Sequence, residues 1–208
     1  RPVAREIELK LRLSPAQAKR LPSHPALAGV APQKYKLANT YYDTPAFDLR
    51  KRAVALRLRR KGWSEWLMTV KAGEAVAGGL AQRNEWEAPT EPDVFDFGIV
   101  TDAGLRAFLE SHQAELVPAF STDFTRTAWT VERDGALIEV SLDRGRIVAG
   151  GAASSGTGHP DQVSEPICEI ELELLAGPVR DAHQQARHLS ALGAGVRRRP
   201  HPVPHRVE

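Results

Sequence analysis

The chain has 208 residues, of which 42% are hydrophobic and 26% are charged, and its formal net charge is +2. So small a net charge gives no reason to expect nucleic acid as a partner, and no apolar run approaches the ~18 residues that a membrane-spanning helix requires. The single cysteine, Cys168, excludes an internal disulfide framework and fits a reducing compartment, so we expect a cytoplasmic protein with no membrane partner.

The first predicted element is a β-strand over residues 5–13, REIELKLRL, in which apolar and charged residues alternate strictly. Glu6, Glu8 and Lys10 share one face of this strand because alternate side chains point the same way. The Ser-Pro pair that opens residues 14–21 then predicts a short helix with a serine cap.

Further strands are predicted in the first half of the chain over residues 34–45, 53–62, 64–73 and 79–89. A tight turn at Lys61-Gly62 joins two of these strands into a hairpin. In the strand before this turn, Arg57 and Arg59 lie on one face and leucines lie on the other.

The second half of the chain continues with alternating strands. After a predicted helix at 101–116 come strands at 119–135, 136–150 and 165–177, a helix at 178–192 and a tail at 193–208 that we expect to be disordered. The turn Arg133-Asp134-Gly135 predicts a hairpin. Parallel βαβ alternation is absent, so an α+β, mainly β fold is expected, with an antiparallel sheet that closes on itself.

The charged faces of these strands segregate by sign. For any one strand a face open to water is the ordinary interpretation, but like charges two residues apart lie about 6.6 Å from each other and repel. The acidic set comprises Glu6 and Glu8, Glu85 and Glu87, Glu139 and Asp143, and Glu169, Glu171 and Glu173. The basic set comprises Lys10, Arg57, Arg59, Lys71 and Arg126.

A closed barrel would bring its first and last strands together and gather four or five carboxylates in one place. Such a cluster is a site for a hard cation. The basic side chains in the same lumen would require an anion with several charges. A polyphosphate bound with Mg²⁺ or Mn²⁺ is the simplest ligand that satisfies both sets.

Several stretches resemble one family. EIELK matches the Glu-x-Glu-x-Lys signature of the CYTH superfamily, the triphosphate tunnel metalloenzymes. The match continues in order through YYDTP, ALRLRR, WLMTVKAG, GGLAQRNEWE, DFTRTAW, IEVSLDRG and EPICEIELEL. It is most similar to the bacterial inorganic triphosphatases, which usually carry a C-terminal helical (CHAD) domain. We therefore expect either a CYTH domain that stands alone or a fragment of a longer protein. We expect residues 1–192 to form the tunnel domain.

The resemblance implies a closed eight-stranded antiparallel tunnel that holds a triphosphate lengthwise. It assigns metal binding to Glu6, Glu8, Asp143, Glu169 and Glu171. It assigns phosphate binding and catalysis to Lys10, Arg57, Arg59, Lys71 and Arg126. Glu85 matches a catalytic tunnel glutamate, and Glu87 shares its face and is assigned to the substrate. Glu173 also lies on the acidic face, so the register of the last strand is open by two residues.

The expected function is metal-dependent hydrolysis of inorganic triphosphate, with Mg²⁺ or Mn²⁺ as cofactor. Other triphosphate chemistry in the same tunnel stays open: a thiamine or nucleoside triphosphatase, or an adenylate cyclase. A polyphosphate-binding module without catalysis is a third interpretation, although it would not need the acidic set. Whether the chain forms a homodimer is left open.

Overall fold

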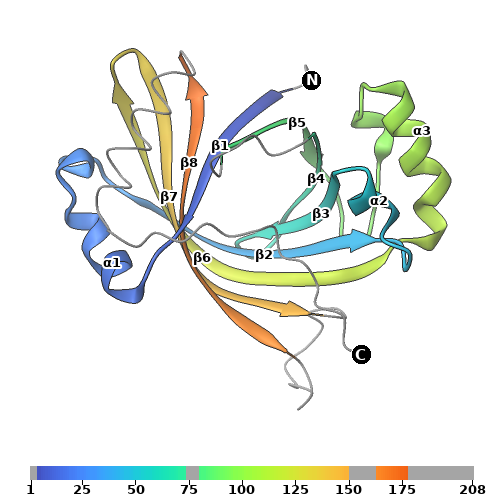
Figure 1. Cartoon of the computed structure of the whole chain (residues 1–208), viewed down its shortest axis with the longest axis horizontal. Coiled ribbons are helices and arrows are strands. Elements are labelled where there is room, and N and C mark those ends of the chain that lie inside the picture. Colours follow the sequence, from blue (N-terminus) through green and yellow to red (C-terminus); the bar gives the residue numbers. More distant parts are fainter. Residues whose placement is uncertain (1–3, 74–79, 150–162, 178–208) are drawn as a thin grey trace.

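The structure is a computed structural model that describes residues 4–73, 80–149 and 163–177. Figure 1 shows a β-barrel with short helices on two opposite sides. The strands are β1 (Ala4–Arg12), β2 (Gln33–Asp43), β3 (Val54–Lys61), β4 (Glu65–Ala72), β5 (Leu80–Pro89), β6 (Val117–Arg133), β7 (Ala136–Ala149) and β8 (Ser164–Ala176). The predicted helix at 178–192 and the tail at 193–208 lie outside the described residues.

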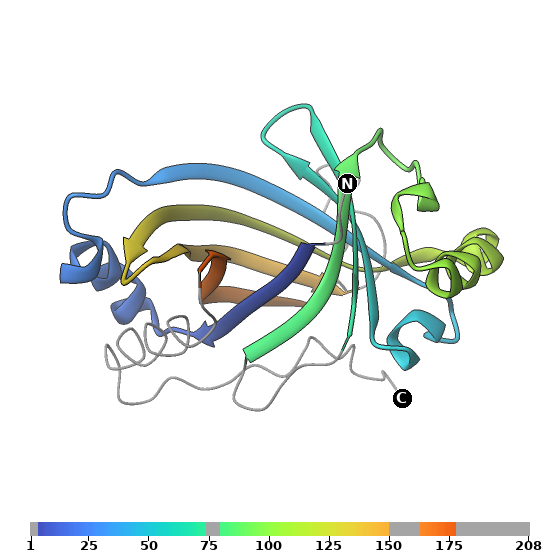
Figure 2. The ribbon, with the colours of Figure 1, turned by 90° about the horizontal axis from the view of Figure 1, so that it is seen from above.

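The sheet closes in the order β1-β5-β4-β3-β2-β6-β7-β8, and every neighbouring pair is antiparallel. The predicted closed antiparallel barrel is therefore confirmed. β1 pairs with β8 on one side, with Lys10 opposite Glu171, and with β5 on the other, with Glu6 opposite Arg83. Figure 2 shows β2, β6 and β7 running side by side in the wall of the barrel.

The helices lie outside the barrel and cover its apolar outer face. They are α1 (Pro15–Arg20), α2 (Asp48–Lys51) and α3 (Ala103–His112), with short 3-10 helices at Leu21–Ser23, Pro25–Leu27, Phe97–Ile99 and Gln113–Glu115. α1 begins with the predicted serine cap, and Asp102 caps α3, which is shorter than predicted because its last turn tightens into a 3-10 helix. Among the described residues, no helix is both long enough and apolar enough to cross a membrane.

Two separate apolar clusters form on this outer face. One joins β1, β6, β7 and β8 to α1 and contains Leu11, Leu21 and Trp129. The other joins β3, β4 and β5 to α2 and α3 and contains Leu56 and Trp86. The hydrophobic core therefore surrounds most of the barrel, and the barrel interior is left largely to polar side chains.

The stretch YYDTP fixes the exit from β2. Asp43 is buried, and its carboxylate accepts hydrogen bonds from the backbone N–H groups of Thr44, Leu49 and Arg50 at 2.7–3.1 Å. These donors belong to the first turns around α2, where backbone groups have no partner within the helix. The Asp of this motif therefore stabilises a chain reversal and does not face the lumen cavity.

One end of the lumen holds a small apolar cluster. Leu37, Phe124, Ile147 and Ile167 are buried there on the inward-facing positions of β2, β6, β7 and β8. Gly145 lies opposite Phe124 in the same layer. A Cβ at Gly145 would collide with the backbone carbonyl oxygen of Asp123 and would lie 2.5 Å from Phe124 Cα, so the close approach of β6 and β7 requires glycine here.

We predict that Gly145→Ala lowers the free energy of unfolding by at least about 1–3 kcal/mol, because overpacking against backbone atoms cannot be relieved by a rotamer change. Urea denaturation followed by circular dichroism measures the effect. The matched variant is Gly104→Ala in α3, where a Cβ would meet an ordinary 3.5 Å contact. Gly104→Ala is expected to be neutral or slightly stabilising. Equal stability of the two variants would contradict the prediction.

Candidate active site in the barrel lumen

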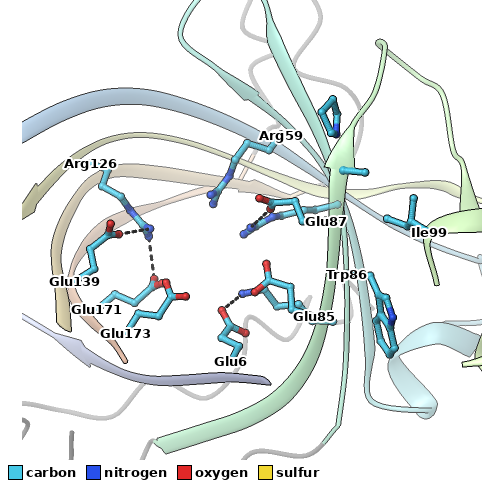
Figure 3. A pocket seen from close by; sticks show the side chains of 14 residues that line it. Glu6, Arg59, Glu85, Trp86, Glu87, Ile99, Arg126, Glu139, Glu171 and Glu173 are labelled. Atoms are coloured by element: carbon cyan, nitrogen blue, oxygen red, sulfur yellow. Dashed lines mark hydrogen bonds and ion pairs between the residues drawn. The ribbon is translucent and has the colours of Figure 1, made fainter. Parts of the chain in front are cut away.

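The lumen contains a cavity of about 530 Å³ lined largely by charged side chains. Figure 3 shows arginines and carboxylates pointing toward one another across it. The charged lining residues are Glu6, Arg57, Arg59, Lys71, Glu85, Glu87, Arg126, Glu139, Glu171 and Glu173. Sequence alternation had placed all of these on the charged strand faces, and the structure brings them into one cavity.

The remaining predicted site residues lie beside the cavity and are tied to it by ion pairs. Lys10 is 3.1 Å from Glu171 and 3.7 Å from Glu169. Asp143 pairs with Arg126, as described below. Glu8 lies 3.9 Å from Lys71 and also contacts Arg83, a residue to which the sequence had given no role.

Arg83 was missed although its position on the inward face of β5 was visible in the alternation. It is 9% exposed and donates a hydrogen bond to Glu8 through Nη2. Its Nη2 also lies 3.8 Å from Glu6 Oε2. Because Arg83 is opposite Glu6 in the β1–β5 register, its contact with these carboxylates depends on which strand pairs with β1. That pairing partner could not be read from β5 alone.

Arg126 is the most heavily paired cation of the cavity. Its Nε and Nη2 donate to the two oxygens of Asp143, each at 2.8 Å, and Nη2 also donates to Glu171 at 3.0 Å. Burial alone would lower the pKa of Arg126, but the charge of Glu171 and the bidentate contact with Asp143 raise it well above its usual value. Burial alone would raise the pKa of Glu171, but Arg126 and Lys10 hold it well below its usual value. Both groups are therefore fixed as ions.

Arg57 and Arg59 lie on the inward face of β3 and have different partners. Arg57 Nε donates to Thr69 Oγ1 at 3.2 Å, and its Nη2 lies 3.6 Å from Glu87 Oε2. Thr69 in turn donates to Glu87 at 2.7 Å. A carboxylate therefore compensates the charge of Arg57.

Arg59 has a neutral partner instead. Its Nε donates to Asn39 Oδ1 at 2.7 Å, and no carboxylate of the described residues forms an ion pair with it. Burial and the neighbouring charges of Arg57 and Arg126 lower the pKa of Arg59 to about 10. Arg59 therefore remains a cation at neutral pH in surroundings that favour the approach of an anion.

Tyr41 completes the basic side of the lumen. Its ring stacks on Phe120 with centroids 4.4 Å apart. Burial alone would raise the pKa of its phenol, but Arg57, Lys10 and Arg59 lower it. The sequence gives Tyr41 no role beyond a strand and the matching stretch YYDTP, because a tyrosine in an alternating strand gives no signal of its surroundings.

Three carboxylates gather on the opposite side of the cavity. One oxygen from each of Glu6, Glu85 and Glu173 lies within 4.8 Å of the others, which is close enough to share one cation. Lys71 pairs with one oxygen of Glu6, while the other, Oε2, is buried and accepts no hydrogen bond from the described residues. Burial and the charges of Glu171 and Glu6 raise the pKa of Glu173 to about 8. A bound cation would relieve this repulsion, so the residues fit a metal site.

The cluster differs in membership from the metal ligands that the resemblance implied. Glu6 belongs to both sets, whereas Glu8, Asp143 and Glu171 form ion pairs with Arg83, Arg126 or Lys10. Glu173 enters through the register of β8, in which it lies opposite Glu8. Placing Glu173 required this register, which the sequence left open by two residues.

The fold and the site together define the class of protein. It is a closed eight-stranded antiparallel β-barrel with clustered basic and acidic side chains in its lumen. Comparison with known proteins gives the family: residues 4–196 match the CYTH domain, and the chain belongs to the CYTH domain family. The resemblance inferred from the motifs is thus confirmed.

A curated relative is the inorganic triphosphatase of Haemophilus influenzae, which is 38% identical over 180 residues. The match covers 85% of this chain and 47% of the relative, so the chain spans about half the length of that protein.

Solved structures agree in fold. A Hippeastrum protein described as an adenylyl cyclase candidate with a dominant triphosphatase activity has a TM-score of 0.61 at 21% identity, covering 93% of this chain and 90% of the other. A protein of Pyrococcus horikoshii has a TM-score of 0.60 at 21% identity, covering 94% of each chain. At this identity the likeness concerns the barrel and not its chemistry.

We predict that Glu173→Gln stabilises the metal-free protein increasingly as the pH rises from about 4.5 to about 8. In this window the unfolded chain has released the proton of Glu173 and the folded chain retains it, because the pKa rises from 4.5 to about 8 on folding. Wild-type stability should therefore fall by up to about 1.4 kcal/mol per pH unit through this group, and glutamine removes that slope.

Urea unfolding in EDTA at pH 5, 6.5 and 8 measures the difference between variant and wild type. The control is Glu132→Gln, at an exposed position of β6, for which no such growth with pH is expected. A Glu173→Gln difference that stays constant over the three pH values would show that Glu173 is not held in its protonated form.

Proposed function

We propose that the chain hydrolyses inorganic triphosphate in a metal-dependent reaction, in which PPPi and water give PPi and Pi. The observation that carries the proposal is the presence of two complementary sites in one cavity. Arg59 lies near the positive charges of Arg57 and Arg126. Carboxylate oxygens of Glu6, Glu85 and Glu173 lie within 4.8 Å of one another. A polyphosphate bound with a divalent cation stabilises both. The 38% identity to an inorganic triphosphatase supports the same assignment.

In this proposal the basic residues bind the phosphoryl oxygens. Arg59 uses Nε for the buried neutral partner Asn39, which leaves its Nη groups for the anion. Arg57 uses Nε for Thr69, and its Nη2 lies 3.6 Å from Glu87, so it shares its charge between that carboxylate and the anion. Arginine suits this role because its planar fork matches phosphate geometry. Lys10, Lys71 and Arg126 add positive charge along the cavity, and each is held in position by carboxylates.

We propose Mg²⁺ or Mn²⁺ as the metal, held by Glu6, Glu85 and Glu173. The donors are carboxylate oxygens only, which fits a hard cation and not a thiolate-binding metal. Glu8, Asp143, Glu169 and Glu171 remain the further ligands that the family resemblance proposes. When bound, a divalent cation neutralises phosphate charge and polarises a phosphoryl oxygen.

The chain contributes mainly positioning and charge. Phosphoryl transfer passes through a loose transition state with its charge spread over the phosphoryl oxygens, so little covalent chemistry is required of the protein. Arg59 and Arg57 stabilise that charge from one side of the cavity. Glu87 belongs to the same wall and holds Arg57, so its assigned contact with substrate acts through the arginine.

The substrate class is tested by measuring phosphate release from PPPi, ATP and thiamine triphosphate with Mg²⁺, with Mn²⁺ and with EDTA. We expect PPPi to be the best substrate and EDTA to abolish the reaction. Cyclic AMP formed from ATP would favour a cyclase instead. Tight binding of PPPi without turnover under any metal would favour a polyphosphate-binding module.

The cellular location and the oligomeric state of the protein are proposed separately from its reaction. A cytoplasmic location is supported by the single cysteine and by the composition. A homodimer stays an open hypothesis, which size-exclusion chromatography with light scattering would decide.

We predict that Arg59→Gln lowers kcat/KM for PPPi on the order of 10²–10³-fold, the usual effect of removing one electrostatic donor from a site that stabilises developing charge. The matched variant is Arg60→Gln on the same strand, since Arg60 is exposed on the outer face of β3 and changes the net charge equally. Arg60→Gln should keep wild-type kinetics. A similar loss in both variants would mean that overall charge, and not the lumen contact, governs the rate.

A further inference from the structure

Two arginines in this lumen make the same contact through Nε with partners of different charge. Arg126 Nε donates to Asp143 Oδ1 at 2.8 Å, and Arg59 Nε donates to Asn39 Oδ1 at 2.7 Å. Aspartate and asparagine have nearly the same shape, so the two contacts differ mainly in charge. The aspartate neutralises its arginine, whereas the asparagine holds its arginine and leaves the positive charge uncompensated.

Asn39 is held in place by the barrel itself. It is 2% exposed and lies opposite Arg59 on β3 and opposite Thr122 on β6, so the three residues form one row across three strands. Its Nδ2 donates to Thr122 Oγ1 at 2.8 Å. Because an arginine can only donate, the amide oxygen must face Arg59 and the amide nitrogen must face Thr122. Both ends of the amide are therefore satisfied and its orientation is fixed.

We propose that Asn39 is a positioning residue that sets the anion affinity of the lumen, by orienting Arg59 through a neutral hydrogen bond that leaves the arginine's charge to the bound phosphate. The inference rests on the proposed function, since it takes phosphate as the ligand. The inference gives the buried, uncharged Asn39 a part in substrate affinity: it holds Arg59 without neutralising it, whereas Asp143 neutralises Arg126.

This role has a consequence for stability as well as for binding. An uncompensated guanidinium between Arg57 and Arg126 destabilises the ligand-free barrel, as the lowered pKa of Arg59 indicates. Replacing Asn39 by Asp would keep the hydrogen bond to Nε and add the missing negative charge. The hydroxyl of Thr122 can rotate to donate to the new carboxylate. The ligand-free protein should then become more stable while its affinity for an anion falls.

The test compares wild type, Asn39→Asp and Asn84→Asp. Asn84 is an exposed residue of β5, so its variant makes the same change in net charge outside the lumen. We measure Tm without ligand, the Kd for inorganic triphosphate by calorimetry in EDTA, and KM and kcat for triphosphate with Mg²⁺. For Asn39→Asp we expect a Kd and a KM raised at least tenfold and a Tm equal to or above that of wild type.

Asn84→Asp should match wild type in Kd, KM and Tm. Unchanged Kd and KM in Asn39→Asp would overturn the inference while leaving the proposed function intact. A fall in both Tm and affinity would also overturn it, because Asn39 would then act only in packing. Failure of the wild-type chain to bind or hydrolyse triphosphate would instead overturn the proposed function, and the inference with it.

A second pair of variants applies if Asn39→Asp does not fold. Thr122→Val removes the acceptor that orients the amide, whereas Thr122→Ser keeps the hydroxyl. We expect Thr122→Val to raise KM for triphosphate several-fold with a smaller change in kcat, and Thr122→Ser to restore the wild-type KM. Equal KM values in the two variants would overturn the positioning role of the Asn39–Thr122 pair.

Discussion

The pairing of β1 with β8 is the contact on which the site depends. β1 carries Glu6, Glu8 and Lys10, and β8 carries Glu169, Glu171 and Glu173, so about four-fifths of the chain separates groups that meet in the lumen. If the sheet stayed open, these carboxylates would face water on two distant edges and would repel little. Closure places them within a few ångströms of each other, in surroundings where charges interact more strongly than in water. The acidic cluster is thus a product of topology as much as of composition.

Closure also requires that most of the enclosed charge be compensated. Ion pairs within the lumen do this: Lys71 with Glu6, Arg83 with Glu8, Lys10 with Glu171, and Arg126 with Asp143. Such pairs hold long side chains in fixed positions, because breaking one leaves a charge buried without its partner. Against this paired background three groups differ: Arg59, and the carboxylates Glu85 and Glu173, which lie beside the paired Glu6. In the proposed function these exceptions bind the ligand, while the pairs give the cavity a defined shape.

Much of this could be predicted from the sequence, and the limits have physical causes. Period-two alternation predicted the strands and which side chains face inward, since that information is local to each strand. It could not predict that Arg83 contacts Glu8, because the contact depends on β5 being the neighbour of β1. It could not choose between Glu171 and Glu173, because a shift of two residues in register keeps the same face inward. Asn39 and Thr69 gave no signal, since a neutral polar residue in a strand has no pattern that reveals a buried arginine beside it.

The position of the hydrophobic core determines which residues of this protein can be substituted without loss of the fold. The interior of an eight-stranded barrel is just wide enough to be filled by side chains or to hold one small ligand. Here the two main apolar clusters lie on the outside, under α1 on one flank and under α2 and α3 on the other. Folding and chemistry are thereby assigned to opposite faces of the same strands. Lumen side chains can therefore be exchanged without dismantling the core, so one barrel can serve as a common scaffold for different charged sites.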